Sequence, residues 1–362
     1  MTPTRVAHLG KYLPPVLGGM ETSIYEICKS LASLSDTKIR LIGANTCNRS
    51  EHLEISPCFE ISKLARITEV FSTPLLRGLK REIKEFNPQV IHLHLPNPYL
   101  SSVLQPQGRP LVVTYHCEIL TYPALLKLYA PVLDATLKYA SKIIATSEQS
   151  LEHSPYLQKH RNKCVVVPLG IQKNSSTLET ESMPAEKIVL FVGRLVQYKG
   201  LQDLIRAMTL VDGKLLVAGT GPLLKELQDL TTSLGIRNKV IFLGAVSGEE
   251  LENYYRKARV VALTSLDERE AFGMVLVEAL SFGRPLLTTK IPSGVQFVNR
   301  DGVTGFQVEV GDVKAIARSI TRLLTDQELW LKFSKQARQH FNDNFEISNV
   351  ARAYRKIYDE VL

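Results

Sequence analysis

The second half of the chain begins with Phe191-Val192-Gly193-Arg194-Leu195-Val196-Gln197-Tyr198-Lys199-Gly200, in which an apolar strand runs into a loop and then into a helix. Similar apolar runs alternate with helical stretches at residues 6–10, 39–44, 90–94, 111–116, 142–146, 164–168, 188–193, 215–219, 240–243, 260–264 and 286–289. Strands that are apolar throughout are typical of parallel sheets buried on both faces. Strand–helix alternation therefore predicts an α/β fold with doubly wound parallel sheets.

The strand–helix pattern restarts after Gly170, and residues 171–186 form a polar, linker-like stretch. With 362 residues, the chain is long enough for two domains that each bury a core. We expect a first Rossmann-like domain over residues 1–170 and a second over residues 171–348. From residue 326 onward the sequence predicts helices and no further strand.

Positive charge is concentrated in the first half of the chain. The formal net charge is +8, and residues 1–170 hold 19 Lys and Arg against 13 Asp and Glu. This excess favours an anionic partner, such as a lipid surface, a phosphorylated acceptor or nucleic acid; the alternative is an ordinary solvated surface. The five cysteines include no CxxC pair, and no apolar stretch approaches the length of a membrane-spanning helix. We expect a reducing, cytoplasmic location.

Residues 74–86 predict a basic amphipathic helix. Apolar and basic side chains interleave there at helical spacing, namely Leu75, Leu76, Leu79, Ile83 and Phe86 with Arg77, Lys80, Arg81 and Lys84. Such a helix can lie on an anionic membrane surface. The alternative, and the commoner use of this pattern, is a helix that packs on the sheet and keeps its charged face in water.

Two glutamates, Glu270 and Glu278, stand eight positions apart in an otherwise apolar segment at the start of a predicted helix. This spacing is close to two helical turns, so both side chains can project to one side. Carboxylates buried there need hydrogen-bond donors, and a sugar offers many. The alternative is a pair of ordinary glutamates on a helix surface.

Cations and glycines follow several predicted strands. Arg194 and Lys199 leave the carboxyl end of a strand, where doubly wound sheets bind ligands, and together they suit a diphosphate. The pair Gly18-Gly19 precedes a helix predicted from about Thr22, which suits either an anion at the helix end or a simple turn. Gly221, in Gly219-Thr220-Gly221-Pro222, belongs to a tight strand-to-helix turn that can border a ligand.

Histidines end two of the predicted strands. His116 stands at a carboxyl strand end, from which it can reach the central crevice of an open sheet. His92 and His94 share a strand face, but two ligands without a nearby carboxylate are too few for a metal site. We interpret His8 and His92 as structural residues and predict no metal.

Taken one by one these motifs are unspecific, but their order along the chain is informative. The series runs Gly18-Gly19-x-Glu21, His116, Val167-Pro168-Leu169-Gly170-Ile171, Gly193-Arg194 with Lys199-Gly200, Gly219-Thr220-Gly221-Pro222, Phe242-Leu243-Gly244 and Glu270-x7-Glu278. Over nearly the whole chain it resembles the retaining glycosyltransferases of family 4. The resemblance implies the GT-B fold, in which two Rossmann-like doubly wound domains face each other across a cleft.

The resemblance also implies roles for residues of the second domain. Glu278 would hydrogen-bond the ribose of a nucleotide-diphosphate sugar, and Glu270 would face the donor sugar. The amides of Phe272, Gly273 and Met274 would point toward sugar and phosphate.

Further roles follow in the same way. Arg194 and Lys199 would bind the diphosphate, Gly18 and Gly19 would approach the phosphate from the first domain, and His116 would face the reacting sugar. The nucleobase of the donor would lie near Gly244 and Val246, and the turn that contains Gly221 would also border the ligand. The last helix, residues 349–362, would pack back on the first domain.

The resemblance implies a metal-free, cofactor-free transfer with retention of anomeric configuration, in which the departing phosphate takes the acceptor's proton. The segments 115–119 and 167–171 look like those of bacterial enzymes that build O-antigen and other surface polysaccharides, several of which use GDP-mannose. Glu118 keeps the acidic residue that such members place after the histidine, whereas Cys117 departs from them.

From this resemblance we predict transfer of a hexose, with mannose from GDP-mannose as the best guess and UDP as the other nucleotide, onto a lipid-linked or oligosaccharide acceptor. We expect no nucleic-acid partner. If residues 74–86 are used for membrane contact rather than only for packing, the protein would attach peripherally to the inner face of the cytoplasmic membrane. Two alternatives stay open: a nucleotide-sugar 2-epimerase of the same architecture, and a non-catalytic subunit that binds sugar nucleotides. A dinucleotide oxidoreductase is disfavoured, because no full GxGxxG motif with a following acidic residue occurs.

Overall fold

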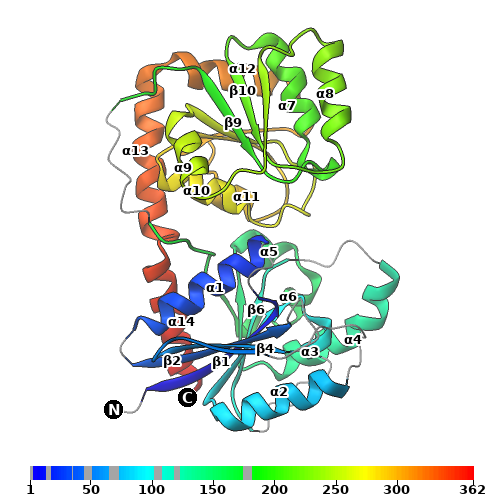
Figure 1. Cartoon of the computed structure of the whole chain (residues 1–362), viewed down its shortest axis with the longest axis vertical. Coiled ribbons are helices and arrows are strands. Elements are labelled where there is room, and N and C mark those ends of the chain that lie inside the picture. The colour runs from blue at the N-terminus through cyan, green and yellow to red at the C-terminus, as the bar shows by residue number, and fades with distance from the viewer. Residues whose placement is uncertain are drawn as a thin grey trace. The chain divides into compact units, whose positions relative to one another are not determined.

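Residues 3–13, 18–34, 36–44, 51–64, 73–101, 108–117, 123–173 and 182–362 are described by the computed structural model, without the side chains of residues 73–76, 99, 123–126 and 128. The chain folds into two compact units (Figure 1). Unit 1 comprises Met1–Gln172 with Glu346–Leu362, and unit 2 comprises Lys173–Phe345. The predicted boundaries were residues 170 and 348.

Unit 1 is built on an eight-stranded sheet of order β3-β4-β2-β1-β5-β6-β7-β8. Its strands are β1 (Thr4–Tyr12), β2 (Thr37–Ala44), β3 (Glu51–Ser56), β4 (Phe59–Leu64), β5 (Val90–Leu95), β6 (Leu111–Tyr115), β7 (Lys142–Ala145) and β8 (Cys164–Val166). All neighbours pair in parallel except β3 and β4. The six strands predicted in this half are present, but the β3–β4 hairpin was missed. Because β3 is a largely exposed edge strand, it lacks the continuous apolar run by which the other strands were predicted.

Helices cover both faces of this sheet. They are α1 (Gly19–Ala32), α2 (Thr73–Phe86), α3 (Pro98–Ser101), α4 (Pro123–Tyr139), α5 (Glu148–His153), α6 (Pro155–Lys159), the short 3-10 turn η1 (Arg161–Lys163) and α14 (Ile347–Val361). α1 and α14 pack together, and α14 hydrogen-bonds side chains of β1, β5 and β6. The other face packs against α2 and α4. The start of α1 was predicted at about Thr22 and lies at Gly19, because Gly18 is the extended residue that precedes the first turn.

Unit 2 is built on six parallel strands of order β11-β10-β9-β12-β13-β14. They are β9 (Ile188–Val192), β10 (Lys214–Ala218), β11 (Val240–Gly244), β12 (Val260–Leu263), β13 (Leu286–Thr289) and β14 (Gly305–Val308). The short edge strand β14 was missed, because a glycine and a glutamine interrupt its apolar residues. Strand order reverses between the neighbours β9 and β12, so the carboxyl ends of these two strands border the topological switch point.

The helical elements of unit 2 are η2 (Gln197–Lys199), α7 (Leu201–Ala207), η3 (Met208–Leu210), α8 (Leu224–Ser233), α9 (Gly248–Lys257), α10 (Met274–Ser281), α11 (Val295–Val298), α12 (Val313–Thr325) and α13 (Gln327–Asn344). The last helix of the chain, α14, belongs to unit 1, where the Ile347 amide donates to the Ile171 carbonyl at 3.0 Å.

Helix α2 uses its apolar face for packing. Leu79, Ile83 and Phe86 are buried in the core of unit 1, whereas Lys80 and Lys84 are exposed. The apolar face of this helix therefore packs on the sheet, as one of the two alternatives for residues 74–86 expected. In the described part of the chain, no helix combines the length and apolarity needed to cross a bilayer. Free thiols there are Cys28, Cys58, Cys117 and Cys164.

Candidate active site

The loops that follow β9 and β12 are joined at the switch point by one backbone–backbone and one side-chain–backbone hydrogen bond. The Leu266 amide donates to the Tyr198 carbonyl at 2.8 Å, and the Thr264 hydroxyl donates to the Gly200 carbonyl at 3.0 Å. These bonds connect residues more than sixty positions apart in sequence, so they set the distance between side chains carried by the two loops.

Lys199 and Glu270 form an ion pair across this junction. Their side chains are only 12% and 10% exposed, so water screens their attraction poorly. The Ser265 hydroxyl donates to the same Glu270 oxygen, Oε2, at 3.3 Å. Among the described residues, Oε1 of Glu270 has no hydrogen-bond partner, so it is the oxygen that can accept a bond from a ligand.

Glu270 does not lie in a helix, contrary to the sequence prediction. Its amide donates to the Asp267 carbonyl at 3.2 Å in a turn, and α10 begins only at Met274. Gly273 precedes the helix with φ of 76°, a left-handed conformation that interrupts helical backbone and that glycine adopts without strain. The eight-residue spacing to Glu278 therefore spans a loop and a short helix rather than two helical turns.

Glu278 lies inside α10 and accepts a hydrogen bond from the Tyr255 hydroxyl at 2.7 Å. Burial raises the pKa of Glu278, and the Tyr255 hydrogen bond opposes that rise. Tyr255 is itself buried and stacks on Phe282 with ring centroids 5.4 Å apart. Sequence reasoning missed Tyr255, for which helix α9 carries no distinctive signal. It also missed Ser265, whose polar position directly after an apolar strand could have been noticed.

Arg194 is the exposed cation of the site. It follows β9, and the described residues include no ion-pair partner for it. Near the other loop, Phe272 is buried, and Gly273 and Met274 form the amino-terminal end of α10. The first amides of a helix lack partners within the helix, so they can donate to an anionic ligand.

The predicted glycine turn after β10 packs backbone against backbone with the β9 loop. A Cβ atom on Gly219 would lie 1.9 Å from the Gly193 carbonyl oxygen, and one on Gly221 would lie 2.4 Å from the Leu195 carbonyl oxygen. Close approach of two loops therefore explains these glycines. The Gly219 amide also donates to the Gly244 carbonyl at 2.7 Å, which brings the end of β11 and nearby Val246 to the same sheet edge.

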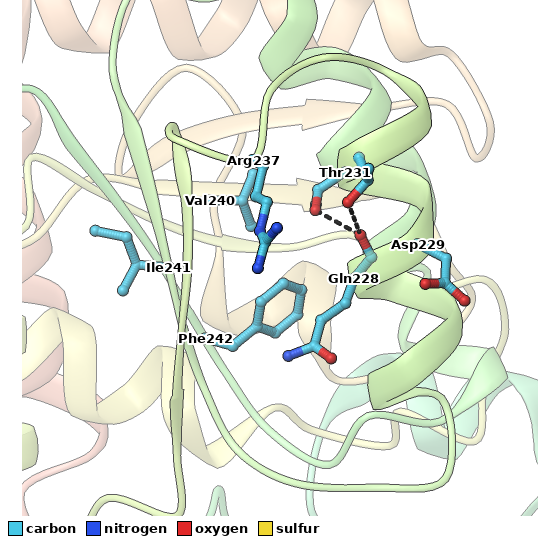
Figure 2. A pocket seen from close by; sticks show the side chains of 8 residues that line it. Gln228, Asp229, Thr231, Arg237, Val240, Ile241 and Phe242 are labelled. Carbon is cyan, nitrogen blue, oxygen red and sulfur yellow. Dashed lines mark hydrogen bonds between the residues drawn. The ribbon is translucent and has the colours of Figure 1, made fainter.

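A hollow of about 470 Å³ lies between α8 and the edge strand β11, and Figure 2 shows the side chains that line it. Arg237 and Phe242 point into it, and Thr231 and Thr232 donate to the Gln228 carbonyl along α8. None of the predicted site residues lines this hollow. It is therefore distinct from the switch-point site.

The predicted residues of the first domain, Gly18, Gly19 and His116, belong to unit 1. Gly18 directly precedes α1, Gly19 is its first residue, and His116 directly follows β6. His116 is 4% exposed, and burial lowers its pKa to about 4. Its Nδ1 atom has no hydrogen-bond partner among the described residues. Glu118, the acidic residue noted beside it, lies outside the described residues.

His8, His92 and His94 come together in the core of unit 1, with one ring nitrogen from each within 4.8 Å of the others. The sequence argument against a metal counted only His92 and His94, so the structure adds a third candidate ligand. Both ring nitrogens of each histidine already have hydrogen-bond partners within the protein. A metal would have to replace some of these bonds.

Two family models match the chain. Residues 173–340 match the model described as Glycosyl transferases group 1, and residues 17–174 match Glycosyltransferase Family 4. The chain is 30% identical to the O-antigen chain mannosyltransferase C of Escherichia coli, over 99% of both chains. It is also 30% identical to the D-rhamnosyltransferase WbpZ of Pseudomonas aeruginosa, over 84% of this chain and 82% of that one.

Among solved structures, HepE of Anabaena in complex with UDP and glucose has a TM-score of 0.77 at 19% identity, over 99% of this chain and 100% of that one. This likeness confirms the fold prediction of two parallel-sheet α/β domains of the GT-B type. Because a relative of 30% identity matches almost the full length, the chain belongs to the family 4 glycosyltransferases and is a transferase.

Proposed function

We propose that this glycosyltransferase moves a hexose, with retention of anomeric configuration, from a nucleotide sugar to a lipid-linked or glycan acceptor in surface polysaccharide synthesis. The observation that carries this proposal is the buried Lys199–Glu270 pair at the switch point, with Arg194 exposed beside it in sequence. Mannose from GDP-mannose is the first candidate donor, because a full-length relative is an O-antigen mannosyltransferase. The equally identical D-rhamnosyltransferase and the UDP bound by HepE make other sugars and UDP the competing candidates.

The polar groups divide the work between diphosphate and sugar. Arg194 has no carboxylate partner among the described residues, so its guanidinium can give its full charge to the diphosphate. Lys199 shares its charge with Glu270 and is thereby held in one place. The remaining Glu270 oxygen then accepts a hydrogen bond from a hydroxyl of the donor sugar, and Glu278 accepts from the ribose.

Bond changes in the proposed transfer need no protein base. The bond between the anomeric carbon and the phosphate oxygen breaks, and the acceptor oxygen bonds to the same face of that carbon. The acceptor's proton passes to the departing phosphate. Arg194, Lys199 and the amides at the start of α10 stabilise the negative charge that develops on the diphosphate, so we propose that no metal or cofactor is required.

We predict that Glu270→Gln lowers kcat by about a hundredfold, because the neutral amide loses both the Lys199 pair and a charged acceptor for the sugar. Nucleoside diphosphate affinity should not fall, because Lys199 is freed from its carboxylate. Initial rates and calorimetry measure the two effects. Glu249→Gln, on an exposed position of α9, is the matched control. Wild-type turnover of Glu270→Gln would remove Glu270 from the site.

Variants of Arg194 and Arg237 test whether the nucleotide binds at the switch-point site or in the hollow of Figure 2. Arg194→Gln should weaken binding of GDP or UDP by about tenfold or more, because a charge-assisted phosphate contact is lost. Arg237→Gln, in the hollow, should bind as tightly as the wild type. Calorimetry measures the nucleotide affinity of both variants. Weaker binding in Arg237→Gln with wild-type binding in Arg194→Gln would place the nucleotide in the hollow.

The donor can be identified by thermal unfolding with a panel of nucleotide sugars. At a concentration of about one hundred times Kd, a ligand stabilises the folded state by about 2.7 kcal/mol, so the true donor should raise Tm most. We expect GDP-mannose to exceed UDP-glucose, UDP-galactose and GDP-fucose at equal concentration. A larger shift with a UDP sugar would contradict the donor assignment and leave the transferase function intact.

We further propose that the charged face of α2 contacts anionic lipid while its apolar face stays in the core. Replacing Arg77, Lys80, Arg81 and Lys84 by Gln should abolish sedimentation with phosphatidylglycerol vesicles, since each cation near the surface contributes about 1 kcal/mol. Wild-type binding should also fall as salt rises. The matched control replaces four exposed cations of unit 2, Lys314, Arg318, Lys332 and Lys335. Equal loss in both variants would mean that only net charge matters.

A further inference from the structure

Four histidines line one face of the unit 1 sheet beneath α14. His8 of β1 lies opposite His92 of β5, and His94 lies opposite Thr114 of β6. Alternate residues of a strand share a face, so His116, two residues after Thr114, continues the row. The rings are close: His8 and His92, and likewise His92 and His94, have centroids 4.6 Å apart.

An unbroken chain of hydrogen bonds runs through this row. Its six bonds join, in order, Tyr354 to Thr114 (3.2 Å), Thr114 to His92 (2.7 Å), His92 to Tyr358 (2.6 Å), Tyr358 to His8 (3.0 Å), His8 to His94 (3.0 Å) and His94 to His116 (3.0 Å). Both tyrosines come from α14. The far end of the chain is Nδ1 of His116, which has no partner among the described residues.

The histidines in this chain are uncharged at neutral pH. Burial lowers the pKa of His8 to about 3 and that of His116 to about 4, and it lowers the pKa values of His92 and His94 well below their ordinary value. A neutral imidazole has one N–H donor and one lone-pair nitrogen. Each ring in the chain therefore accepts on one side and donates on the other.

Counting hydrogens limits the possible directions of donation. The three hydroxyls and four neutral rings hold seven mobile hydrogens for six bonds, so one hydrogen is left over. If every group donates toward His116, the leftover hydrogen is on Nδ1 of His116. Every other arrangement leaves it on a hydroxyl of Tyr354, Tyr358 or Thr114, each fully buried and without a further acceptor among the described residues. Nδ1 of His116 is buried as well, so every arrangement leaves one hydrogen without an acceptor among the described residues. Donation toward His116 places that hydrogen at the carboxyl end of β6, the sheet edge at which doubly wound folds bind ligands, where a bound ligand can accept it. The hydroxyls of Tyr354, Tyr358 and Thr114 lie inside the core, so donation toward His116 is the arrangement that a ligand can complete.

We propose that Tyr358 of α14 is a positioning residue that holds His116 in its Nδ1–H tautomer through His8 and His94. Tyr358 donates to Nε2 of His8, Nδ1 of His8 donates to Nε2 of His94, and Nδ1 of His94 donates to Nε2 of His116. The ring of His116 is then unable to accept a proton at Nδ1 and presents a hydrogen-bond donor there.

The consequence for catalysis rests on the proposed function and on the role that the family resemblance implies for His116, which is to face the reacting sugar. A fixed Nδ1–H group would donate to an oxygen of the donor sugar and could not act as a general base. The carboxyl-terminal helix, although it is the last element of the chain, would thereby determine the chemistry of a residue that follows β6.

Nitrogen-15 NMR of the full chain labelled at histidine tests the proposal directly, because long-range proton couplings distinguish the two tautomers. The His116 signals are assigned by their loss in His116→Gln. In the wild type, His116 should be the Nδ1–H tautomer, and Nε2–H in the wild type would overturn the proposal without any variant. Tyr358→Phe should populate both tautomers of His116.

Tyr354→Phe is the matched control, because it removes one hydroxyl from the same buried helix face. Thr114 still donates to His92 in that variant, so the His116 tautomer should stay as in the wild type. A His116 tautomer unchanged in Tyr358→Phe, or changed equally in both variants, would overturn the proposal.

Turnover separates the tautomer proposal from the proposed function. We expect kcat to fall about tenfold in Tyr358→Phe with little change in KM for the nucleotide sugar, and to stay near wild type in Tyr354→Phe. A tautomer change without loss of kcat would support the role of Tyr358 and contradict the placement of His116 at the sugar.

Discussion

The ion pair between Lys199 and Glu270 is the interaction on which the account of unit 2 depends. The loops after β9 and β12 that carry the two residues are held together by a backbone and a side-chain hydrogen bond at the point where strand order reverses. Burial strengthens the pair and fixes both side chains. Because Glu270 pairs with Lys199 through one oxygen, Arg194 stays available to an anion and the other oxygen of Glu270 stays available to a hydroxyl.

Much of this arrangement could be predicted from the sequence. The strands that are apolar throughout were all predicted, because buried parallel strands commonly have this signature. Cations placed directly after a strand indicated the sheet edge at which ligands bind. The edge strands β3 and β14 were missed because one is exposed and the other is interrupted by a polar residue. The buried strand β4 was missed because Glu60, Ser62 and Lys63 interrupt its apolar residues. The prediction that Glu270 lies in a helix was wrong, because Gly273 has a left-handed backbone conformation and α10 begins only after it, at Met274.

Contacts between residues far apart in the chain could not be predicted from the sequence. No local pattern shows that Tyr255 supports Glu278, or that Tyr358 lies above His8, 350 residues away. The histidines looked like separate structural residues because their strands are distant in sequence, and only the sheet register places them in one row. The two proposals rest on different kinds of contact, a charged pair in unit 2 and an uncharged hydrogen-bond chain in unit 1.

Hydrogen–deuterium exchange with and without the nucleotide sugar tests the central claim most directly, because it reports where the donor binds without assuming any residue's role. The account predicts slower exchange of backbone amides in residues 193–203 and 264–276, the loops after β9 and β12 with the helix starts that follow them. Residues 228–242, around the hollow beside β11, should exchange as in the free protein. Protection confined to residues 228–242, or absent from both switch-point loops, would contradict the assignment of the donor site.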